Sequence, residues 1–150
     1  MLYKSLQTTL LLLLANLAHA GSAIEINAPW IRSAPPGVSV MAGYLSLSNH
    51  GHQTAALVAV NSPQFHSVEL HRTKLQNGMM HMEKVERLAL ESGQAILFEP
   101  GGYHLMLMDP HQPLKRGEIA ELVFKFSNGE KIKAMAKVQD TPPGTTDMNH

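Results

Sequence analysis

Short runs of alternating apolar and polar residues, separated by turn residues, recur along this chain between residues 24 and 138. Successive side chains of a β-strand point to opposite faces, so this alternation is typical of strands that bury one face. The intervening Gly, Pro, Asn, Asp and Ser residues are typical of turns. Many short strands at fairly regular spacing indicate a sandwich or a related all-β architecture. We therefore expect an all-β fold, a single antiparallel β-sandwich, and the length suits one domain.

The Asn-Gly pair at residues 128–129 lies between two alternating runs, residues 121–126 and 131–138. A change of register by one residue turns every side chain of a strand to the other face. A two-residue loop would thus place the apolar residues of the two runs on opposite faces. We predict a three-residue loop instead, in which Phe126 pairs with Ile132 and both apolar sets face the core.

A second Asn-Gly pair, Asn77-Gly78, is among the strongest short-range signals for a β-hairpin. The type I′ turn of such hairpins needs positive φ at both central residues, which Asn and Gly tolerate. With a two-residue loop, Thr73 pairs with Met82 and His71 pairs with Lys84. His71 and Met82 then lie on one face as diagonal cross-strand neighbours, within reach of long side chains.

The run from residue 103 to residue 108 also alternates between two kinds of side chain. One face carries Leu105 and Leu107, which we expect to pack in the core. The other carries His104 and Met106. This second face is therefore available to a ligand.

Imidazole nitrogen and thioether sulfur both suit copper, and the soft thioether favours Cu(I). Two separate parts of the chain each place one His and one Met on a common face, in a chain with nine Met and no Cys. Taken alone, each residue has an ordinary interpretation, because Met often fills cores and His is often at the surface. The joint pattern favours the hypothesis that His71, Met82, His104 and Met106 form one Cu(I) site.

This pattern resembles that of the periplasmic copper chaperones called PCuA(C). Ten residues separate His71 from Met82, twenty-one separate Met82 from His104, and Met106 follows two positions later. The flanking run Pro100–Met108 also resembles that family. The resemblance implies a cupredoxin-like fold, this ligand set, and delivery of copper to acceptors such as a cytochrome c oxidase subunit or its assembly factors. Arg72 departs from the resemblance, because an acidic residue is more usual there.

Residues 1–20 have the features of a signal peptide. Lys4 supplies a positive charge, Leu10–Leu17 is too short to span a bilayer, and Ala18-His19-Ala20 has the small-x-small form of a cleavage site. We predict a periplasmic copper-binding domain over residues 21–140, with no membrane span after cleavage. A lipid anchor would require a Cys at the cleavage point, and the sequence contains none.

Residues 141–150 contain Pro142-Pro143-Gly144 and no apolar pattern, so we predict a disordered tail. Met148 and His150 within it are further potential copper donors, although a solvated tail is the more ordinary interpretation.

Several other function classes fit the composition less well. A blue-copper electron-transfer site requires a Cys thiolate, which this chain lacks. Zinc enzymes usually bind the metal through His and carboxylates, and two Met are unusual zinc ligands, so we expect no enzyme. Twelve basic and twelve acidic residues give no case for nucleic-acid binding. An exported metal-dependent enzyme and a metal-free interaction domain remain the alternatives.

Overall fold

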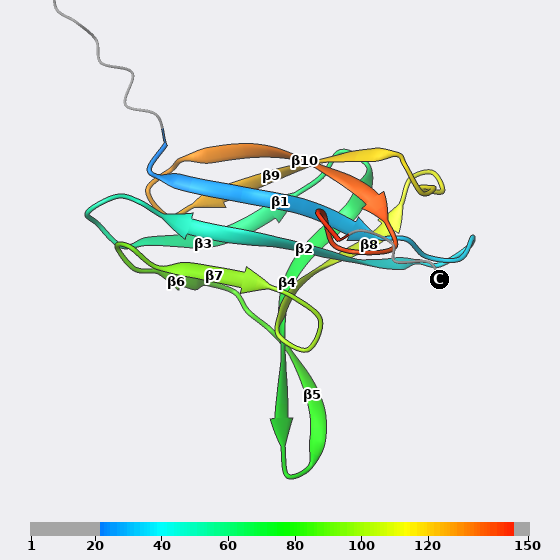
Figure 1. Ribbon diagram of the computed structural model, residues 1–150, viewed down its shortest axis with the longest axis horizontal. Coiled ribbons are helices and arrows are strands. Elements are labelled where there is room, and N and C mark those ends of the chain that lie inside the picture. Colours follow the sequence, from blue (N-terminus) through cyan, green and yellow to red (C-terminus); the bar gives the residue numbers. More distant parts are fainter. Residues whose placement is uncertain (1–21, 146–150) are drawn as a thin grey trace, which may run out of the picture.

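The computed structural model describes residues 22–145, which form ten strands (Figure 1). The strands are β1 (Ile24–Arg32), β2 (Val40–Asn49), β3 (Ala55–Asn61), β4 (Phe65–Gln76), β5 (Met79–Lys84), β6 (Leu88–Leu90), β7 (Ala95–Phe98), β8 (Tyr103–Pro110), β9 (Ile119–Phe126) and β10 (Lys131–Gln139). The all-β prediction is confirmed. The described residues include no helix of the length and apolarity needed to cross a membrane.

The predicted signal peptide lies outside the described residues, and so do Met148 and His150 of the predicted tail. The described part of that tail contains a turn in which the Thr145 N–H donates to the Pro142 carbonyl at 3.3 Å. The domain boundaries at residues 20 and 140 stay predictions.

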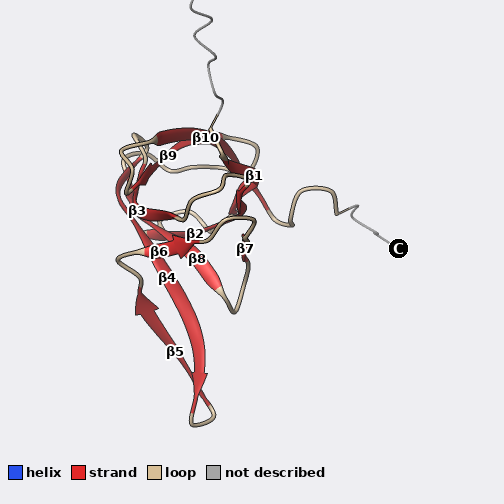
Figure 2. Ribbon diagram, turned by 90° about the vertical axis from the view of Figure 1, so that its left-hand side faces the viewer, coloured by secondary structure: helices blue, strands red, loops and turns tan. Residues whose placement is uncertain are grey.

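All ten strands belong to one sheet, in the order β5-β4-β8-β7-β2-β1-β10-β9-β3-β6. An additional pairing of β3 with β4, with Val60 opposite Val68, closes this sheet around a common interior (Figure 2). Most ladders are antiparallel, as predicted. The β1–β10 and β7–β8 ladders are parallel, and the β1–β10 ladder joins the two ends of the domain. Turn signals report only neighbouring strands, so they did not indicate this distant pairing.

The interior is filled by the side chains that the alternation assigns to it. Leu105, Leu107, Leu122 and Phe124 are each at most 1% exposed. Burial of a Leu or Phe side chain contributes roughly 1.5–3 kcal/mol relative to exposure. Because Leu105 and Leu107 pack in this core from one face of β8, the opposite face of β8 points to the outside of the closed sheet.

The β9–β10 hairpin shows the predicted three-residue loop, with a different register. Phe124 lies opposite Ile132, and the Phe126 N–H donates to the Glu130 carbonyl at 2.9 Å. The predicted pairing of Phe126 with Ile132 is therefore wrong by two positions. A shift of two preserves the face of every side chain, which is why the shared core face was predicted correctly.

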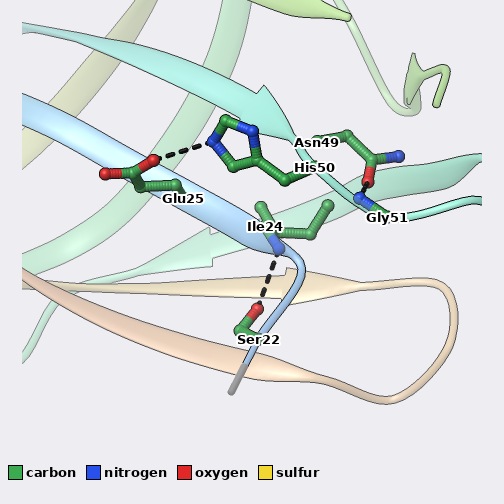
Figure 3. Close-up of polar contacts among 6 residues, drawn as sticks. All are labelled: Ser22, Ile24, Glu25, Asn49, His50 and Gly51. Carbon is green, nitrogen blue, oxygen red and sulfur yellow. Dashed lines mark hydrogen bonds and ion pairs between the residues drawn. The ribbon is translucent and has the colours of Figure 1, made fainter. Parts of the chain in front are cut away.

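The start of β1 is tied to the end of β2 by local polar contacts (Figure 3). The His50 ring Nε2 lies 2.8 Å from Glu25 Oε2, and the Asn49 side-chain oxygen accepts the Gly51 N–H at 2.9 Å. The buried Asn49 amide also donates to the Leu90 carbonyl at 3.0 Å. These bonds fix the end of the sheet, and they give His50 a structural partner.

Candidate metal centre

The β4–β5 hairpin projects from the closed sheet, as both ribbon views show (Figures 1 and 2). Asn77 and Gly78 have φ of 52° and 74°, the positive values that a type I′ turn needs. Thr73 lies opposite Met82, and His71 lies opposite Lys84. The register predicted from Asn77-Gly78 is therefore confirmed.

The hairpin meets β8 through β4, which pairs with β8 along most of its length. His71 lies directly opposite His104, and their ring centroids are 6.0 Å apart. Glu69 lies opposite Met106 in the same ladder. This pairing brings the two parts of the predicted ligand set to one face of the sheet, although they are distant in sequence.

An open hollow of about 330 Å³ covers the outer face of this region. Met82, His104 and Met106 all line it, beside Thr73 of β4. Residues of β2 and of the turn before β8 complete the lining: Val40, Met41, Ala42, Tyr44, Pro100 and Gly101. His104 is 7% exposed, whereas Met82 is 57% exposed. The hollow thus joins one buried imidazole to one thioether that solvent reaches freely.

The imidazole of His104 is oriented by the backbone. Its Nδ1 lies 3.1 Å from the Gly102 carbonyl oxygen. A carbonyl only accepts hydrogen bonds, so Nδ1 carries the proton in the neutral ring. The Nε2 atom then holds the free lone pair, which is the form that a metal ion requires.

His71 is oriented by a carboxylate. Its Nε2 lies 2.8 Å from Glu69 Oε2, and the other oxygen of Glu69 lies 3.2 Å from Lys84 Nζ. The pKa of the Glu69 carboxyl is lowered below its usual value, most by the hydrogen bond from His71 and next by the hydrogen bond from Lys84. The same carboxylate raises the pKa of Lys84. Glu69 therefore links His71 to the opposite strand of the hairpin.

Arg72 lies on the sheet face opposite to His71, because adjacent residues of a strand alternate. Its guanidinium carbon lies 5.1 Å from the centroid of the Tyr103 ring, directly across the β4–β8 ladder. Arg72, which departs from the pattern of the resembling family, thus packs on the face away from the candidate site. The acidic partner of His71 comes from Glu69, which has the i and i+2 spacing that places both on one face.

The four predicted ligands differ in how closely the structure groups them. Met82, His104 and Met106 line one hollow, whereas His71 is not among the lining residues and lies next to them, directly opposite His104. Within residues 22–145, no three His, Cys, Asp or Glu side chains gather in a group suited to a metal ion. The sequence also contained a signal for Glu69, its shared face with His71, but none for the role of Gly102.

The fold and this face define a small all-β domain with imidazole and thioether groups gathered on one side of a closed sheet. Residues 24–138 match the family described as putative lipoprotein LpqE-like, and the chain belongs to this family. A putative lipoprotein of Leifsonia xyli, Lxx21020, is 28% identical over 118 residues, which cover 78% of this chain and 70% of that protein. The uncharacterized protein RP573 of Rickettsia prowazekii is 32% identical over 132 residues, which cover 85% of this chain and 73% of that protein.

Solved structures share this fold. The copper-bound PCuAC domain from PmoF2 superposes with a TM-score of 0.68 at 24% identity, covering 82% of this chain and 97% of that domain. The Cu(I) form of DR1885 from Deinococcus radiodurans superposes with a TM-score of 0.64 at 26% identity, covering 84% of this chain and 83% of that protein. The predicted resemblance to the PCuA(C) family is confirmed.

Proposed function

We propose that this chain is a periplasmic carrier of Cu(I), and not an enzyme, that binds the metal through His71, Met82, His104 and Met106. The observation that supports this most is the β4–β8 pairing, which sets His71 against His104 beside a hollow lined by two Met. Copper is the cargo of such a protein. It is taken up, held and passed on unchanged.

The donor set suits Cu(I) better than other metal ions. Two neutral imidazoles and two thioethers add no negative charge, and soft sulfur favours Cu(I), whereas Cu(II) prefers nitrogen and oxygen ligands in tetragonal geometry. His104 already presents a free Nε2 lone pair, because its Nδ1–H donates a hydrogen bond to the Gly102 carbonyl oxygen. The residues that are present therefore fit the proposed cargo.

The exposure of the site suits release as well as capture. Met82 is 57% exposed on the projecting hairpin, while His104 is buried. A copper-accepting protein would thus reach the metal from the Met82 side without unfolding the domain. The absence of a Cys thiolate also avoids a ligand that oxidises readily outside the cytoplasm.

The solved relatives support the choice of metal. DR1885 has been solved with Cu(I), and the PmoF2 domain has been solved with copper. The resemblance to PCuA(C) further suggests acceptors such as a cytochrome c oxidase subunit or its assembly factors. The predicted signal peptide and the lipoprotein description of the family support export.

An anaerobic titration of the domain with Cu(I), with X-ray absorption spectroscopy at the end point, tests the proposal. We expect one tightly bound Cu(I) with both sulfur and nitrogen neighbours. Transfer to a purified copper-accepting domain of cytochrome c oxidase then tests delivery. Preferential uptake of zinc would favour the metal-dependent enzyme, and failure to bind either metal would favour an interaction domain.

A further inference from the structure

The two imidazoles of the candidate site make their hydrogen bonds through opposite nitrogens. His104 uses Nδ1, which lies 3.1 Å from the Gly102 carbonyl oxygen. His71 uses Nε2, which lies 2.8 Å from Glu69 Oε2. Because both acceptors are oxygens without a proton to give at neutral pH, each contact assigns the proton to the imidazole nitrogen.

A neutral imidazole has one protonated nitrogen and one free lone pair. The lone pair of His104 is consequently on Nε2, and that of His71 is on Nδ1. The Nδ1 atom of His71 is buried and has no hydrogen-bond partner among the described residues. A buried polar atom without a partner destabilises the folded state, so a ligand bound at Nδ1 of His71 would offset this cost.

The carboxylate of Glu69 is itself held in place. Lys84 Nζ lies 3.2 Å from its second oxygen and 3.4 Å from Glu86 Oε1. Lys84 lies directly opposite His71 in the hairpin, two residues beyond Met82. The register that brings Met82 to the site therefore also brings the cation that fixes the partner of His71.

We propose that Glu69 is a positioning residue that makes His71 meet Cu(I) through Nδ1, while His104 meets it through Nε2. This inference rests on the proposed function. Partners of metal-binding imidazoles fix the tautomer and the ring orientation, and their loss typically weakens metal affinity by about 10- to 100-fold. If Glu69 instead competed with copper for Nε2 of His71, its removal would strengthen Cu(I) binding. The two roles therefore predict opposite changes in Cu(I) affinity when Glu69 is replaced.

The first measurement uses the metal-free protein and does not depend on copper. Long-range ¹H–¹⁵N spectra of the imidazoles report which nitrogen carries the proton. We expect the Nε2–H tautomer for His71 and the Nδ1–H tautomer for His104. In Glu69→Ala, His71 should lose this preference, and in Glu69→Gln, whose amide oxygen still accepts a hydrogen bond, it should be largely retained. The Nδ1–H tautomer for His71 in the parent protein would overturn the proposal.

The second measurement adds Cu(I) under anaerobic conditions. We expect the bound metal to shift Nδ1 of His71 and Nε2 of His104, and Glu69→Ala to bind roughly 10- to 100-fold more weakly. Glu86→Ala is the matched control, because Glu86 contacts Lys84 but not His71, and it should bind as the parent does. Copper bound to Nε2 of His71, or tighter binding by Glu69→Ala, would overturn this inference and leave the carrier function standing. Protein that takes up no Cu(I) would overturn both.

Discussion

His71 lies directly opposite His104 in the β4–β8 ladder, with ring centroids 6.0 Å apart. Each of these His residues has a Met on its own side of the ladder, Met82 from the hairpin and Met106 from β8. The pairing of β4 with β8 therefore joins two incomplete donor pairs into one candidate site. Loss of one Met should leave the fold intact and the site incomplete.

Met82→Leu and Met106→Leu should each lower Cu(I) affinity while leaving the domain folded. Such swaps roughly keep volume and apolarity, and they usually cost less than about 1.5 kcal/mol of stability. We expect a loss of affinity of at least about tenfold, equivalent to roughly 1.4 kcal/mol of binding free energy. Competition with a Cu(I) chelator measures the affinity, and thermal unfolding measures the stability.

The controls for these variants are Met80→Leu, Met108→Leu and His81→Ala. Met80 lies opposite Leu75 near the hairpin tip, and Met108 lies opposite Ser67, beyond Met106. The His81 side chain lies on the other face of β5. All three should bind Cu(I) nearly as the parent does. Loss of copper by Met80→Leu or Met108→Leu, with normal binding by Met82→Leu, would contradict the proposed ligand set.

The metal preference of the domain follows from its thioether donors. One Cu(I) should bind at this site, and Zn(II) should bind far more weakly, because zinc is usually held by His, Cys and carboxylates. Anaerobic competition between the two ions measures this preference. Equal competition by zinc would count against Met82 and Met106 as ligands.

The fold should persist without metal. Its interior contains Leu105, Leu107, Leu122 and Phe124, and none of them belongs to the candidate site. This differs from a zinc finger, in which metal binding and folding are coupled. The far-ultraviolet circular dichroism of the metal-free protein should therefore show folded β-structure. A coil spectrum that changes to a β spectrum on addition of Cu(I) would contradict this expectation.

The Asn77-Gly78 turn should control copper binding through geometry alone. Gly78 has φ of 74°, and a Cβ added there would meet no atom within 4 Å. Gly78→Val should thus disturb the turn through backbone strain, which costs roughly 1–2 kcal/mol in the left-handed region, and should weaken Cu(I) binding by misplacing Met82. Asn77→Gly keeps the required conformation and should bind normally. Equal binding by Gly78→Val would show that the turn does not position Met82.

The carboxylate of Glu69 should titrate below the usual value of 4.5, because His71 and then Lys84 lower its pKa. The stability that these contacts contribute is present above the usual pKa and is lost as the pH falls through the lowered pKa of the folded protein. Lys84→Met should raise the pKa of Glu69 toward 4.5. Carboxyl ¹³C shifts followed against pH measure both values, and an unchanged pKa in Lys84→Met would contradict the contact with Lys84.

The sequence by itself determined the strands, the hairpin and the donor types. The Asn77-Gly78 turn requires positive φ at adjacent residues, and this local constraint determines that Thr73 pairs with Met82. The alternation of residues 103–108 likewise separates the core face of β8 from the face that carries His104. Both are properties of short segments, so local stereochemistry and burial suffice to predict them.

Only the tertiary structure decided which segments meet. The pairing of His71 with His104, the parallel β1–β10 ladder and the bond from His71 to Glu69 all depend on how distant strands pack. Turn residues constrain only their neighbours, whereas these contacts depend on the closure of the whole sheet. The register of the β9–β10 hairpin was likewise decided only by the structure. A register shift of two residues leaves every side chain on the same face of the sheet, so the apolar pattern of the sequence cannot distinguish the two registers.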